Sequence, residues 1–252
     1  MSRAGHITHI LIATGFVASG LAVVMHSRGL PRLEETYGSG GALTSLSPDL
    51  AGRTSSDLIQ HLYLRPENPV MWALLVVLFL LVLLDAGGEV IESPARKRRG
   101  GHGVCPALAL ALIGGALWPW LDGQEPLIAA VCAILTAISA TVASVRASNQ
   151  HRPAIGFLAG WSTGLAAASL AAVIAEQASL GISQTAIVAI LPAAIMGMAV
   201  QHRLGRSFSY SVALIWAFCG LAATTMGTAP MAALAAILGI TAMTAALIRA
   251  AS

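Results

Sequence analysis

The sequence is poor in charge. Only 10% of its 252 residues are Asp, Glu, Lys or Arg, whereas about 25% of an ordinary soluble domain is charged. Hydrophobic residues make up 56% of the chain. A surface with so few charges cannot be kept in water. This composition therefore excludes a soluble globular protein and predicts an integral membrane protein.

The sequence patterns of common enzymes, metal sites and nucleic-acid-binding proteins are also missing. No HExxH, Walker or GxGxxG pattern occurs, and the one GxSxG match, Gly160–Gly164, lies inside an apolar run and not at a strand-to-helix turn. Cys105, Cys132 and Cys219 lie far apart in apolar runs, without the spacing of a zinc site, which is typical of small buried residues. Basic residues lie at the ends of apolar runs and are not interleaved with aromatic residues. We therefore expect no enzyme activity, no bound metal and no nucleic-acid partner.

Ionisable residues are almost absent from the middle of the apolar runs, which argues against a proton-driven transporter or an ion pump. Asp85 and Glu89 are four residues apart and share a helix face at the end of one run. They could bind a cation or accept a proton. Pairing with Arg96 or Arg98 is the simpler interpretation.

Histidines near the ends of apolar runs raise the question of haem. A bis-histidine haem needs two imidazoles at one depth on facing helices. His9 and a second histidine could meet this requirement, and the candidates are His102, His151 and His202. Because these residues lie at helix boundaries, the membrane interface explains them more simply. We expect no haem and no other firmly bound cofactor.

Apolar runs long enough to cross a bilayer recur along the chain, since about 20 apolar residues span the hydrocarbon as a helix. Eight are predicted, at residues 7–26, 70–89, 104–121, 125–146, 154–176, 183–201, 208–226 and 230–249. Pro and Gly in the segments between some of them predict tight hairpins. The predicted fold class is therefore all-α: a polytopic integral membrane bundle of about eight transmembrane helices.

Basic residues set the predicted orientation, because they favour the cytoplasmic side. With a cytoplasmic N-terminus, every basic residue lies inside except those of one long loop: Arg28, Arg32, Arg53 and Arg65. Both termini are then cytoplasmic. Only Lys97 is a lysine, and Ala and Gly are abundant, which is typical of GC-rich bacterial coding. We expect a multi-pass protein of the bacterial inner membrane.

Three parts follow from this topology. Residues 1–93 form a two-helix N-terminal part with an extracytoplasmic loop at 27–69, which is either a cap over the helix ends or a docking element. Residues 94–103 form a basic cytoplasmic linker, typical of a topology signal and also able to attract anionic lipid headgroups. Residues 104–252 form a six-helix bundle.

Small residues surround a tryptophan in the run 154–176. Gly160 and Gly164 form a GxxxG pattern, which allows close packing of helix backbones in lipid. Trp161 points about 100° away from Gly160. It could anchor the helix at the membrane interface, fill a gap between helices or contact a ligand, and the interface is the first interpretation.

The other tryptophans divide into two groups. Trp72, Trp118 and Trp120 lie near the predicted outer ends of their helices and resemble an outer aromatic belt. Trp216 lies near the middle of its run, so it must pack or contact a ligand, and its indole N–H needs an acceptor.

The segments "FLAGWSTGLAAASLAAVI" (157–174) and "SYSVALIWAFCGLAA" (209–223) resemble late helices of the TspO/MBR family, also called tryptophan-rich sensory or translocator proteins. The resemblance covers about residues 104–249. The common family form has five helices, whereas this region has six. The resemblance implies a non-enzymatic bundle linked to tetrapyrrole and sterol-like ligands, with Trp161, Tyr210 and Trp216 as pocket residues.

Two functions remain open from the sequence. One is binding or sensing of a small hydrophobic or tetrapyrrole ligand by a TspO-like bundle. The other is an accessory or assembly subunit of a larger respiratory or photosynthetic membrane complex. The expected partners are membrane lipids, together with other membrane subunits or a second copy of the chain.

Overall fold

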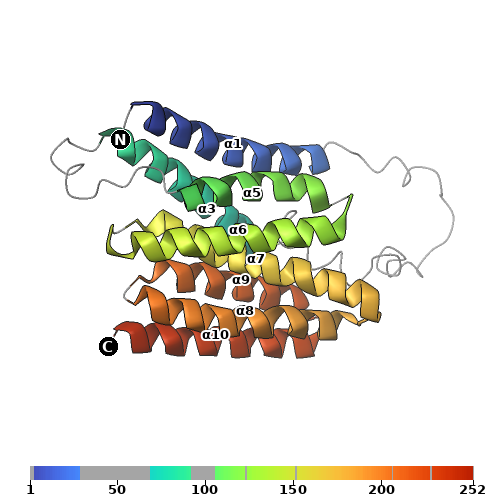
Figure 1. The fold of residues 1–252 in the computed structure, drawn as a ribbon. Coiled ribbons are helices and arrows are strands. Elements are labelled where there is room, and N and C mark those ends of the chain that lie inside the picture. The colour runs from blue at the N-terminus through green and yellow to red at the C-terminus, as the bar shows by residue number, and fades with distance from the viewer. Residues whose placement is uncertain are drawn as a thin grey trace.

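The computed structural model describes residues 3–28, 69–91, 106–122, 124–150, 152–205, 207–227 and 229–251. Regular structure in these ranges is entirely helical (Figure 1). The α-helices are α1 (Arg3–Arg28), α3 (Pro69–Ile91), α5 (Pro106–Asp122), α6 (Pro126–Ala147), α7 (Pro153–Ala178), α8 (Ile182–Leu204), α9 (Ser209–Thr225) and α10 (Pro230–Ala251), with a 3₁₀ turn η2 (Ser148–Gln150) between α6 and α7. Each predicted apolar run is one of these helices, so the all-α bundle is confirmed.

Proline marks where several helices begin. Pro69, Pro106, Pro126, Pro153 and Pro230 are the first residues of their helices. Proline fits this position because the first amide groups of a helix have no intrahelical acceptor and the proline ring already holds a helical φ. The turns that precede α6, α7 and α10 are short, so these helices run antiparallel to the helix before them (Figure 1).

Six of the described helices are long and apolar enough to cross a membrane: α1, α3, α6, α7, α8 and α10. The two others, α5 and α9, each have 17 residues, at the lower limit of about 17–25 for a membrane-spanning helix. Their place beside the longer helices puts them in the same bundle (Figure 1). The chain is therefore a multi-pass integral membrane protein.

The outer surface of the bundle suits lipid. Large apolar side chains are exposed along it, for example on α1, α6, α8 and α10. The exposed hydroxyls of Thr14, Ser139, Thr241 and Thr244 each donate to a carbonyl three or four residues earlier in their own helix. These polar groups are thereby satisfied without water, as the hydrocarbon requires.

Helix α7 is the centre of the bundle. It packs against α3, α6, α8 and α9, and 72% of its span is buried, against 28–39% for the other long helices. Its many Gly, Ala and Ser residues permit this, because small side chains let helix backbones approach one another. A helix surrounded on every side has no lipid face, and α7 shows none along most of its length.

The N-terminal pair packs on the other six helices. α1 contacts α3 and α5, and α3 also contacts α7 and α9. Phe16, Leu78, Trp118 and Trp161 belong to one continuous core that includes both parts. The predicted loop 27–69 and the linker 94–103 lie outside the described residues, apart from the ends of α1 and α3.

α1 begins and α10 ends at the same end of the bundle, on opposite sides of it (Figure 1). This arrangement is required if both termini lie on one side of the membrane. At this end Asp85 forms an ion pair with Arg152. Arg96, Arg98 and the side chain of Glu89 lie outside the described residues. Arg152 can reach Asp85 because the start of α7 and the end of α3 lie at the same end of the bundle.

Candidate functional site

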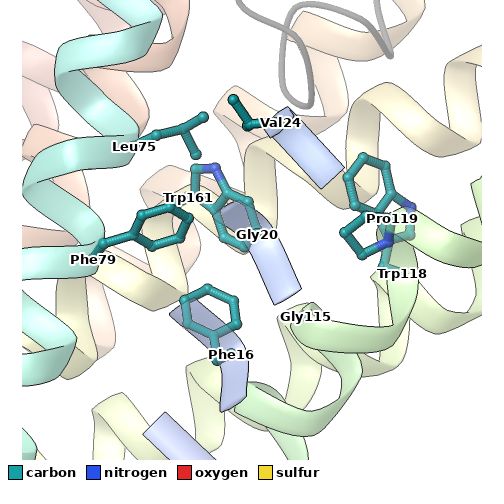
Figure 2. A pocket seen from close by; sticks show the side chains of 9 residues that line it. All are labelled: Phe16, Gly20, Val24, Leu75, Phe79, Gly115, Trp118, Pro119 and Trp161. Atoms are coloured by element: carbon teal, nitrogen blue, oxygen red, sulfur yellow. The ribbon is translucent and has the colours of Figure 1, made fainter. Parts of the chain in front are cut away.

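A cavity lies where the N-terminal pair meets the other helices. It is lined by residues of α1, α3, α5 and α7, and we call it the indole cavity: Phe16, Gly20, Val24, Leu75, Phe79, Gly115, Trp118, Pro119 and Trp161 (Figure 2). Its volume is about 30 Å³ and it is partly open to the surface of the bundle. This volume is about that of one water molecule.

Aromatic rings from three helices meet at one side of the cavity. The ring centroids of Phe16 and Phe79 are 5.7 Å apart at 83°, and those of Phe16 and Trp161 are 6.1 Å apart at 75°. Both pairs are edge-to-face, the arrangement that ring quadrupoles favour. In Figure 2 Trp161 and Phe79 lie on one side of the cavity, and Trp118 lies on the other.

Two glycines in the cavity wall make room for these rings. A Cβ on Gly20 would lie 2.5 Å from Cζ of Phe79, and a Cβ on Gly115 would lie 2.8 Å from Cε2 of Phe16. Both distances are shorter than carbon atoms tolerate. The two phenylalanines therefore fill the space that side chains at positions 20 and 115 would otherwise take.

Two of the residues that line the cavity are buried tryptophans, Trp118 and Trp161. The side chain of Trp118 is fully buried and that of Trp161 is 4% exposed. Among the described residues neither Nε1 has a hydrogen-bond partner. A buried donor without an acceptor costs about 1–3 kcal/mol.

Hydrogen bonds of polar side chains join α1 to α5 next to this cavity. The Oγ of Ser19 on α1 donates to the carbonyl of Ala116 on α5 at 2.6 Å, and accepts from Nε1 of Trp120 at 2.8 Å. Ser19 is next to Gly20 in the sequence, and Trp120 is next to Pro119. Gly20 and Pro119 both line the cavity. Two hydrogen bonds that share the Oγ of Ser19 therefore hold α1 to α5 beside the cavity.

The structure places the three pocket residues expected from the family resemblance in different surroundings. Only Trp161 lines the indole cavity. Tyr210 is fully buried between α9 and α7, and its hydroxyl donates to Oγ1 of Thr163 at 3.1 Å. Trp216 donates from Nε1 to the carbonyl of Val70 at 2.9 Å, so its indole has the acceptor that the sequence predicted.

Gly160, the first glycine of the GxxxG pattern of α7, faces α9. A Cβ on Gly160 would lie 2.9 Å from Cβ of Ala213 and still closer to the carbonyl oxygen of Tyr210. Gly164 is buried one turn further along α7. Gly160 therefore allows α7 and α9 to approach at a distance that any larger residue would prevent.

Two interpretations of the tryptophans are wrong. Trp161 is not an interface anchor, because an anchor must reach the headgroups and this side chain is buried. Trp118 does not belong to an exposed belt, because it faces the interior of the bundle. Trp120, two residues later, is 51% exposed, and Trp72 is half-buried.

The histidines are not brought together as a described site. His9 is buried on α1 and His202 is exposed near the end of α8. The side chains of His6, His102 and His151 lie outside the described residues. Within the described part of the chain, no three His, Cys, Asp or Glu side chains could together hold a metal ion.

Sequence analysis missed Phe16, Phe79 and Trp118 as cavity residues. A proline inside an apolar helix was the available signal, since Pro119 lies within α5 next to Trp118. In comparisons with known proteins, no family model, no curated protein and no solved structure matches the chain.

Proposed function

We propose that the chain is a non-enzymatic, TspO-like protein of the bacterial inner membrane that binds a small hydrophobic molecule in the indole cavity. One observation carries this proposal: two buried tryptophans line one apolar cavity, Trp118 and Trp161, and their indole N–H groups have no partners among the described residues. Ligand sites in proteins have this character, with apolar walls and a few polar groups that fix the orientation of the ligand.

The size of the cavity favours a small ligand over a tetrapyrrole. Pockets for drug-sized ligands enclose about 300–1,000 Å³, whereas the indole cavity encloses about 30 Å³. The ligand therefore places only a small group in the cavity. The rest of the molecule lies outside the cavity.

Indole N–H resonances give a direct test. We would incorporate the chain, with ¹⁵N-labelled tryptophan, into phosphatidylcholine nanodiscs and titrate it with 1-decanol. The five tryptophans give five indole signals, assigned by single Trp→Phe variants. We expect the signals of Trp118 and Trp161 to shift downfield, because new hydrogen bonds deshield the proton. The signals of the other three should stay in place.

Matched variants test the donors. Trp161→Phe removes one donor and should weaken binding of 1-decanol roughly fivefold to tenfold, since one hydrogen bond contributes about 1–1.5 kcal/mol. Trp216→Phe is the control: it removes the same atoms from an indole that already donates to Val70, so binding should be unchanged. Equal effects of the two variants would contradict the proposal.

The accessory-subunit interpretation predicts a different result. Extraction in a mild detergent should then recover the chain only within a larger assembly, and 1-decanol should move neither the Trp118 nor the Trp161 signal. A chain that migrates alone or as a homodimer, and whose two indole signals respond, supports the ligand-binding function. Protoporphyrin added to the same nanodiscs should leave both signals unchanged, because it is too large for the cavity.

A further inference from the structure

We propose that Phe16 and Gly115 together set the width of the group that the indole cavity accepts, so that a slim alkyl group enters and an aromatic ring does not. This inference rests on the proposed function, because it names the class of ligand that the same cavity binds. Its starting point is the ring of Phe16, which forms part of the cavity wall.

The ring of Phe16 is held from three sides. It meets Phe79 of α3 and Trp161 of α7 edge to face, with ring centroids 5.7 and 6.1 Å away, and it lies against α5 at Gly115. Figure 2 shows Phe16 beside these three residues. The side chain is only 3% exposed. A ring packed in this way cannot turn aside to admit a larger group.

Phe79, the other phenylalanine of the cavity wall, is less confined. It is only partly buried, so its ring has a free surface and can shift when a group enters. Trp118 and Trp161 are the residues whose indoles carry the proposed function. Among the aromatic residues of the wall, Phe16 is therefore the one that limits the size of the ligand.

Gly115 allows the ring of Phe16 to lie where it does. The three atoms nearest to a Cβ at position 115 would all belong to that ring, with Cε2 at 2.8 Å and Cδ2 at 3.3 Å. One turn further along α1, Ser19 donates to the carbonyl of Ala116 at 2.6 Å, and this bond keeps α1 close to α5. A larger residue at position 115 would therefore push the ring into the free space beside it, which is the indole cavity.

The width that remains is too small for an aromatic ring. The cavity encloses about 30 Å³, whereas apolar cavities that take up benzene enclose about 150 Å³. The ring of Phe16 is itself the size of a benzene molecule. Its removal would therefore leave a space of the right shape for one.

Benzene and 1-decanol test the inference as probes of different width. We would titrate each into the nanodiscs and follow the indole signal of Trp161, which a bound benzene molecule shifts through its ring current. In the unsubstituted chain 1-decanol should move this signal and benzene should not. In Phe16→Ala, benzene should bind at least about tenfold more tightly than in the unsubstituted chain, because it refills the space of the lost ring. Phe16→Leu, a milder truncation that keeps α1 packed, should give an intermediate response.

Phe218→Ala is the matched control. Phe218 is 2% exposed, and its ring also lies over a glycine, since a Cβ on Gly239 would lie 3.0 Å from its Cδ2. It belongs to α9 and does not line the indole cavity. Benzene should leave the Trp161 signal of this variant in place. A response as large as that of Phe16→Ala would overturn the inference.

Substitution of Gly115 tests the same contact from the side of α5. Gly115→Ala should weaken binding of 1-decanol at least about tenfold, because the ring of Phe16 is pushed into the cavity. Gly114→Ala is the control: its Cβ would meet Oγ1 of Thr136 on α6, away from the cavity lining. Binding by this variant should stay within about twofold of the unsubstituted chain. Equal losses in the two variants would overturn the inference.

The double variant Gly115→Ala with Phe16→Ala separates the size limit from general damage at position 115. It should bind 1-decanol again, because the added methyl group no longer meets a ring. Failure to recover binding would overturn the inference. The indole signal of Trp216, which donates to the carbonyl of Val70, shows whether each variant is folded.

The two proposals fail separately in these measurements. If 1-decanol moves neither the Trp118 nor the Trp161 signal of the unsubstituted chain, the proposed function fails. If 1-decanol moves both, and benzene moves Trp161 equally in the unsubstituted chain and in Phe16→Ala, only the size limit fails.

Discussion

Arg152, the residue from which α7 begins, holds Asp85 of α3 through two parallel contacts. Its Nε donates to Oδ1 at 2.9 Å and its Nη2 donates to Oδ2 at 2.5 Å. The two side chains are only 19% and 12% exposed. This two-point geometry is the strong form of a charged hydrogen bond, and it joins the N-terminal helix pair to the central helix.

Removal of one member of this pair should destabilise the protein. Asp85→Ala leaves the Arg152 guanidinium half-buried without its carboxylate, and we expect the free energy of unfolding to fall by about 1.5–3 kcal/mol. Unfolding in mixed detergent micelles, followed by circular dichroism, measures the loss. The double variant Asp85→Ala with Arg152→Ala should recover part of it, since no buried charge then remains.

A control separates this pair from the general effect of removing a charged side chain. Arg203 is exposed near the end of α8, so Arg203→Ala should change the free energy of unfolding by less than about 0.5 kcal/mol. If Asp85→Ala is as mild as Arg203→Ala, the ion pair does not hold α3 to α7.

Gly160 should tolerate no larger residue. The added Cβ of Gly160→Ala would meet Ala213 and the backbone of Tyr210, so α7 and α9 must separate, at a cost of about 1–3 kcal/mol. Gly15 on α1 has open space around it, and Gly15→Ala should stabilise the helix by up to about 1 kcal/mol. Thermal unfolding of the two variants should therefore change in opposite directions; a shift of the same sign would contradict the close approach at Gly160.

The elements of the fold could be predicted because two signals mark them. Apolar runs give the helices, and prolines such as Pro126 and Pro153 mark their first residues. Both signals are local in the sequence. Because lipid demands long apolar segments, few other arrangements of this chain could satisfy its backbone.

The indole cavity could not be predicted in the same way. In a membrane the inner and outer faces of a helix are both apolar, so polarity does not reveal which side is buried. Trp118 and Trp120 looked alike in sequence, yet they point in directions about 200° apart on α5, and one is buried while the other is exposed. The cavity also needs Phe16 and Trp161, which are far apart in the sequence.

Trp161 and Trp216 should respond differently to the same truncation. Trp216→Phe loses the hydrogen bond from Nε1 to the Val70 carbonyl, whereas Trp161→Phe removes a donor without a described partner. The volume removed is the same in both. In the absence of ligand, we expect Trp216→Phe to be the more destabilising by at least about 1 kcal/mol, measured by unfolding in detergent. Equal losses would show that the Trp161 N–H has an acceptor in the membrane.

The orientation of the bundle in the membrane can be measured at two exposed turns, which lie at its opposite ends. Gln150 lies between α6 and α7, near Arg146 and Arg152, and Gln124 lies between α5 and α6, beside Glu125. Positive residues favour the cytoplasm, so the first turn should be cytoplasmic and the second extracytoplasmic. In a background with the three native cysteines replaced, Gln124→Cys should react with a membrane-impermeant maleimide on intact bacterial cells, and Gln150→Cys should react only after permeabilisation. The reverse pattern would invert the topology, and labelling of both sites on intact cells would mean that the segment between them does not cross the membrane.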